Sequence, residues 1–78
     1  MVSEGRQLRG ISGEEAVKAF VRLGYTQRKG KHSHVNLVKP RSTRLTIPLH
    51  RELSVGLLLH ELRRAGLTVE QFLEALRG

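Results

Sequence analysis

The apolar residues in the first part of the chain follow a helical pattern over residues 13–23, where they recur at intervals of three and four. Ser12 precedes this segment, and Glu15 lies three residues after Ser12, which is the spacing of a capping box. Gly24 follows the last apolar position and suits the left-handed conformation that often ends a helix. The sequence therefore predicts a helix over residues 13–23.

The helical period returns in two segments near the C-terminus. Residues 55–65 carry an apolar stripe and follow Ser54, a good N-cap residue. Residues 69–76 carry a second stripe and follow Thr68, with Gln71 at the capping-box position. Two more helices are predicted here, the second of them short.

Between the first and second helices the period of the apolar positions changes to two, which is typical of half-buried β-strands. Three segments alternate in this way, at residues 25–29, 33–39 and 44–48. The connection at Gly30 and Lys31 is short enough for a hairpin, and residues 41–43 form the next turn. The sequence predicts an antiparallel meander of three strands.

These elements follow one another in the order α-β-β-β-α-α, which indicates an α+β fold. Helices should cover one face of the three-stranded antiparallel sheet and leave the other face open to solvent. A chain of 78 residues has room for one domain. We assign residues 11–78 to that domain and residues 1–10, which are polar and contain glycine, to a flexible N-terminal segment.

The charge of the chain is strongly positive and unevenly placed. The sequence has 14 Lys and Arg residues against 7 Glu, which gives a formal net charge of +7. No acidic residue occurs between Glu15 and Glu52, and the interval between them is rich in Lys, Arg and His. Such a patch is the electrostatic footprint of a surface that binds a polyanion such as RNA. A major-groove reader of DNA is less well supported, because no predicted helix concentrates the basic residues.

Composition also bears on the compartment and the oligomeric state. The chain has no cysteine, which favours a reducing compartment, and no apolar run of membrane-spanning length. We expect a cytoplasmic protein that does not contact a membrane. Because a core of this size gives only a few kcal/mol of stability, a homo-oligomer or a bound partner would help.

The second predicted strand carries the most distinctive chemistry. Alternation places His32, His34 and Asn36 on one face, while Val35 and Leu37 point to the core. Histidine suits proton transfer near neutral pH. Two alternatives stay open from the residues alone: ordinary surface histidines, or a metal site completed by His50.

Four groups of residues, taken together and in order, resemble the HicA toxins of bacterial HicA–HicB toxin–antitoxin pairs. The resemblance spans about residues 11–76. It rests on Ile11-Ser12-Gly13-Glu14-Glu15 with Gly24-Tyr25, on Ser33-His34 in a basic hairpin, on Thr46-Ile47-Pro48-Leu49-His50, and on residues 62–68 leading into Glu70-Gln71-Phe72-Leu73.

The resemblance implies a fold similar to the double-stranded RNA-binding domain (a dsRBD-like fold), endoribonuclease activity against mRNA, and neutralisation by a HicB-type antitoxin. The family's catalytic histidine follows a Gly-Ser pair at the start of the second strand. That position corresponds to His34, preceded by Ser33, and this chain has His32 in place of the glycine. The change leaves an alternative open, a catalytically inactive RNA-binding module of the same fold.

We therefore expect His34 to act as general acid or base, with no cofactor. Lys31, Arg44 and Lys39 are the candidates for holding phosphate. His32 or His50 is a candidate second proton carrier. The full set of expected RNA-binding residues is Arg28, Lys29, Lys31, His32, Ser33, Lys39, Arg41, Arg44 and His50.

Overall fold

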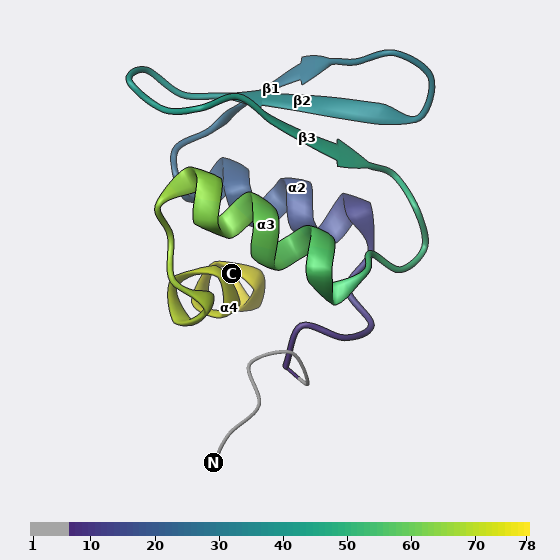
Figure 1. Ribbon diagram of the computed structural model, residues 1–78, viewed down its shortest axis with the longest axis vertical. Coiled ribbons are helices and arrows are strands. Elements are labelled where there is room, and N and C mark those ends of the chain that lie inside the picture. Colours follow the sequence, from purple (N-terminus) through teal and green to yellow (C-terminus); the bar gives the residue numbers. More distant parts are fainter. Residues whose placement is uncertain (1–6) are drawn as a thin grey trace.

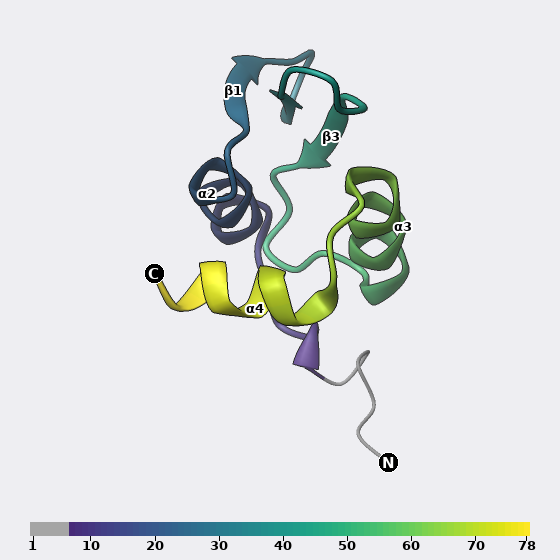
Figure 2. The ribbon, with the colours of Figure 1, turned by 90° about the vertical axis from the view of Figure 1, so that its left-hand side faces the viewer.

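The computed structural model of the protein describes residues 7–78 and confirms the α+β order. The elements are α2 (Gly13–Arg22), β1 (Thr26–Lys29), β2 (His34–Val38), β3 (Leu45–Pro48), α3 (Val55–Ala65) and α4 (Val69–Arg77). The sheet lies above α2 and α3, and α4 crosses below these two helices (Figures 1 and 2). The predicted helix ends differ from the observed ones by one residue at most.

The sheet is the predicted antiparallel meander, with strand order β1-β2-β3. Its apolar side chains come from β2 and β3 in register: Val35 lies opposite Ile47, and Leu37 opposite Leu45. All four are buried, and they face the helical layer seen in Figure 1. The alternating residues of the same strands lie on the opposite, open face.

Two aromatic contacts join the helices at the centre of the core. The ring of Phe20 on α2 lies 5.2 Å from that of Phe72 on α4, measured between centroids. Tyr25 packs edge-on against Phe20 at 5.8 Å and is only 3% exposed. Tyr25 is thus a core residue at the turn from α2 into β1.

The core begins before the predicted domain boundary at residue 11. Leu8 is fully buried, although it belongs to the segment expected to be flexible. A single apolar residue shows no period, so the sequence pattern did not identify it. Residues 1–6 of that segment lie outside the described part of the chain.

The start of α2 is fixed by its caps and by close contact with the segment after β3. Ser12 and Glu15 form the predicted capping box, and the hydrogen bonds from the backbone and side chain of Ser12 lower the pKa of the Glu15 carboxyl group. The amide of Gly13 donates to the carbonyl of His50 at 2.9 Å. A Cβ atom at position 13 would overlap the carbonyl oxygen of Pro48, so only glycine fits there.

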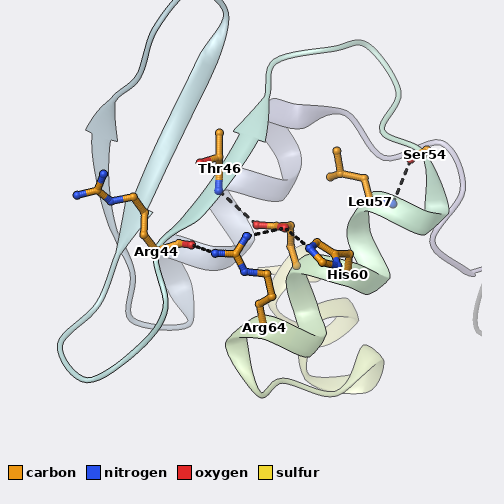
Figure 3. Close-up of polar contacts among 7 residues, drawn as sticks. Arg44, Thr46, Ser54, Leu57, His60 and Arg64 are labelled. Carbon is orange, nitrogen blue, oxygen red and sulfur yellow. Dashed lines mark hydrogen bonds and ion pairs between the residues drawn. The ribbon is translucent and has the colours of Figure 1, made fainter.

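Side chains of α3 bind the outer edge of β3 (Figure 3). The carboxylate of Glu61, which is only 5% exposed, accepts a hydrogen bond from the amide of Thr46 at 3.3 Å. The guanidinium of Arg64 donates to the carbonyl of Arg44 at 2.9 Å and lies 3.7 Å from the Glu61 carboxylate. The helix therefore satisfies one backbone donor of β3 and one backbone acceptor of the residue just before it, as a neighbouring strand would do.

Candidate functional site

His34 is the first residue of β2, and its side chain is exposed. Its amide donates to the carbonyl of Lys31 at 3.1 Å, and its ring Nδ1 lies 3.2 Å from the same oxygen. A carbonyl can only accept, so this contact places the proton of the neutral ring on Nδ1. Nε2 then carries the lone pair, and it is the nitrogen available for proton transfer.

The backbone of Gly30 packs closely against the backbone of His34. A Cβ atom at position 30 would lie 2.6 Å from the carbonyl oxygen of His34, closer than such atoms approach. From the sequence, Gly30 is expected only to form a turn. The structure shows that its lack of a side chain also lets the β1–β2 loop pack directly against the histidine.

His32 lies in the β1–β2 loop, and its predicted place on the strand face beside His34 is wrong. The loop comprises residues 30–33, one residue more than the predicted strands at 25–29 and 33–39 leave between them. His32 has φ +56°, in the left-handed region that favours glycine. This conformation is one that glycine adopts without strain, and it interrupts the alternation that the sequence pattern continues through residue 32.

Ser33 and His50 belong to the same end of the sheet as His34. The carbonyl of Ser33 accepts a hydrogen bond from the amide of Leu49 at 2.7 Å, which continues the pairing of β2 and β3 by one step. His50 follows directly, and its side chain is exposed. The two histidines therefore occupy neighbouring segments.

The structure does not support the metal alternative. Within residues 7–78, no three His, Asp or Glu side chains lie close enough to hold a metal ion. His60 lies on α3, where its ring approaches the buried carboxylate of Glu61 at 3.8 Å. It belongs to the layer that supports β3, away from the open face.

Two basic residues predicted for RNA binding, Arg28 and Arg44, lie on the open face of the sheet. Arg28 of β1, Asn36 of β2 and Thr46 of β3 lie side by side across the three strands. Next to this row is a shallow concavity of about 470 Å³, lined by Arg28, Lys29, Asn36, Val38 and Arg44. The side chain of Arg44 points away from α3, while its carbonyl faces Arg64 (Figure 3).

Lys39 and Arg41 lie at the other end of β2, apart from His34. The ammonium group of Lys39 donates to the carbonyl of Leu23 at 3.1 Å and lies 5.5 Å from the centre of the Tyr25 ring. There it stabilises the C-terminal end of α2. Arg41 is exposed in the β2–β3 loop, with φ +66°. The structure thus separates these two residues from His34.

Two residues of this region are not among the functional candidates expected from the sequence. The expected alternation of β2 puts Asn36 on its observed face but gives no role to its amide. Glu61 was not considered, although it follows Leu58 by three residues and precedes Leu62 in the apolar stripe of α3. A carboxylate inside an apolar stripe was the available signal that a buried polar partner existed.

The described part of the chain contains no helix of the length and apolarity needed to cross a membrane.

Comparison with known proteins identifies the family. A family model described as the HicA toxin of bacterial toxin–antitoxin systems matches residues 13–67, from the start of α2 to just beyond α3. A search of curated proteins returns no match. The matched region includes His34, the β1–β2 loop and the open face of the sheet. The chain therefore belongs to the HicA toxin family and is the toxin of a toxin–antitoxin pair, with a cognate antitoxin as its partner.

Proposed function

We propose that this toxin is an endoribonuclease that binds and cleaves mRNA, with His34 as the general base. The observation that carries the proposal is the contact between Nδ1 of His34 and the Lys31 carbonyl, in an exposed ring at the edge of a basic surface. This contact favours the neutral tautomer in which Nδ1 carries the proton and Nε2 can accept one. An enzyme that activates a ribose 2′-OH needs such a group.

The chemistry requires three contributions from the protein. A base removes the proton of the 2′-OH as this oxygen attacks the phosphorus, an acid protonates the departing 5′-oxygen, and positive groups stabilise the charge on the phosphoryl oxygens. We assign the first role to His34. His50 is the candidate acid, because its segment is hydrogen-bonded to the start of β2 through Leu49 and Ser33.

We assign the phosphate contacts to basic residues of the β1–β2 loop and of the open face. Lys31 lies in the same loop, and Arg28 and Arg44 lie on the open face of the strands. Arg28, Lys31 and Arg44 are exposed, so their charges are available to a bound strand. Because Lys39 binds the end of α2, we assign it to support of the fold instead of phosphate contact.

His32 favours one alternative, a catalytically inactive RNA-binding module. Its side chain stands where related toxins have glycine, at the position that leads the backbone to the catalytic residue. The backbone of His32 has the left-handed φ that glycine adopts readily. The imidazole side chain is therefore what distinguishes this position from a glycine. An inactive module would bind RNA with the same surface and leave it intact.

The test compares the wild type with His34→Ala and His60→Ala, each incubated with a structured mRNA and analysed on a denaturing gel. His60 is an exposed histidine on α3 and serves as the matched control. We expect cleavage by the wild type and His60→Ala and none by His34→Ala, with equal circular dichroism spectra for all three. Intact RNA with all three proteins, together with RNA binding, would establish the inactive module.

The same proposal defines the partner and the place of action. A HicB-type antitoxin would neutralise the toxin, and mRNA as the substrate places the toxin in the cytoplasm. Acidic groups on the antitoxin would suit the basic open face, because opposite charges favour docking. Mixing with antitoxin before the cleavage assay should therefore protect the RNA.

A further inference from the structure

Hydrogen-bonding side chains from all three strands are aligned next to the concavity on the open face. Arg28 and Asn36 are direct neighbours across β1 and β2, and Asn36 and Thr46 across β2 and β3. The Thr46 hydroxyl donates to the amide oxygen of Asn36 at 3.0 Å. This bond fixes the orientation of the Asn36 amide and engages its acceptor, which leaves the amide NH₂ group to face a ligand.

The residues that line the concavity favour a ligand rich in acceptors. Arg28, Lys29 and Arg44 can only donate, and no carboxylate is among the lining residues in the described part of the chain. Adenine and cytosine present an exocyclic amino group, for which these three basic side chains offer no acceptor. Guanine presents two adjacent acceptors, O6 and N7, which match the fork of an arginine guanidinium.

The lining of the concavity suits the ring of a base better than a phosphate alone. Val38 is partly exposed within the lining and gives an apolar surface between the basic groups. A base can lie against Val38 while its edge meets Arg28 and Asn36. A phosphate would gain nothing from the apolar side chain.

The concavity is also next to the proposed catalytic residue. Asn36 follows His34 by two residues on the same face of β2, which corresponds to about 7 Å along a strand. Successive nucleotides of an extended strand are separated by a similar distance. A base in the concavity would therefore belong to a nucleotide next to the phosphate at His34.

We propose that this concavity binds the base of a guanosine next to the scissile phosphate, with Arg28 and Asn36 as specificity-determining residues. The inference rests on the proposed ribonuclease function, because it takes RNA as the ligand. It adds a sequence preference to that function.

The test measures binding by the His34→Ala protein, so that cleavage does not interfere. Fluorescence anisotropy would compare an oligoadenylate with four variants that carry guanosine, inosine, 7-deazaguanosine or an abasic site at one central position. Guanosine and inosine both present O6 and N7, and we expect them to bind about tenfold more tightly than adenosine. The 7-deazaguanosine RNA should lose most of this gain.

Two substitutions in the His34→Ala background locate the preference. Arg28→Lys keeps the charge but removes the fork, and Asn36→Asp keeps the acceptor for Thr46 but removes the amide donors. Each should reduce the preference for guanosine over adenosine to about twofold or less. Arg77→Lys, an exposed position on α4 on the side of the helical layer away from the sheet, is the matched control and should leave the preference unchanged.

Equal affinity for all five RNAs would overturn the guanosine subsite, as would a guanosine preference that survives both substitutions. Equal affinity for the guanosine and abasic RNAs would identify the concavity as a phosphate contact and also overturn the proposal. Cleavage by the wild type is scored separately. Cleavage without base preference would refute only the subsite, whereas guanosine preference without cleavage would refute only the ribonuclease.

Discussion

The two edge strands of the sheet differ in what holds them and in what they present. In β3, Leu45, Ile47 and Pro48 are buried, and its outer edge is bound by two side chains of α3. In β1, all four residues are exposed, and within residues 7–78 no strand pairs with its outer edge. The β3 side is therefore built for stability, and the β1 side keeps its charges and backbone available for binding. Substitutions on the two sides should separate these properties.

The largest effect on stability is expected at Glu61, which links α3 to β3. Glu61→Ala leaves the Thr46 amide without its partner, at a cost of about 2 kcal/mol, and the lost side-chain methylenes raise the total to about 3 kcal/mol. Chemical denaturation would measure the loss. Glu74→Ala, an exposed glutamate on α4, is the control and should change the free energy of unfolding by less than about 0.5 kcal/mol. Equal effects of the two substitutions would contradict the role of Glu61 at the strand edge.

The next largest effect is expected in the loop on the β1 side. Gly30→Ala places a methyl group against the carbonyl of His34, which should cost about 2 kcal/mol and reduce RNA cleavage. The matched control is Gly56→Ala, because a Cβ atom at position 56 meets no other atom within 4 Å. In the first turn of α3, alanine should stabilise the protein by up to about 1 kcal/mol. Opposite signs in thermal denaturation would support this interpretation, and a stabilising Gly30→Ala would refute it.

A smaller effect, of opposite sign, is expected at His32 in the same loop. The left-handed conformation costs a side-chain-bearing residue about 1 kcal/mol, and the greater freedom of glycine in the unfolded chain offsets about half of that. His32→Gly should therefore stabilise the protein by about 0.5 kcal/mol. Ser33→Gly, at the next position, has no left-handed strain to relieve and should destabilise it. A loss of stability in His32→Gly would show that the histidine side chain makes a contact of its own.

The smallest effect on stability is expected at Arg28 on β1. Arg28→Ala removes an exposed side chain and should change the free energy of unfolding by less than about 0.5 kcal/mol. Its effect should appear in binding, where the slope of log affinity against log salt for single-stranded RNA should become shallower by about 0.7. An unchanged slope would place Arg28 outside the RNA contact.

The helices were predictable because their signals are local. The apolar period and the capping residues lie within or next to each helical segment. For α3, the N-cap Ser54 and the C-cap Gly66 predict the observed bounds, Val55–Ala65. The three strands and their order were also predictable, since their alternation is clear and their connections are short.

The details of the site were less predictable, because they depend on contacts between distant segments. The alternating pattern in the sequence extends to His32. In the structure this residue lies in the β1–β2 loop, where its left-handed conformation takes it off the strand face. In the sequence, nothing distinguishes Lys39 from the other basic residues. Its role follows from the hydrogen bond to the end of α2, which only the structure shows. The role of Glu61 depends on β3, fifteen residues away. The charge distribution and the apolar period of the sequence predict which face of the sheet is basic. They do not predict which groups each side chain contacts.

The close approach of Gly13 to the end of β3 has a genetic consequence. Expression of a toxin without its antitoxin selects for cells that carry inactivating mutations. Any residue larger than glycine at position 13 would overlap the Pro48 carbonyl, whatever its polarity, and separate α2 from the segment that carries His50. Survivors of such a selection should therefore include many different replacements at codon 13, although this residue lies outside the proposed catalytic surface.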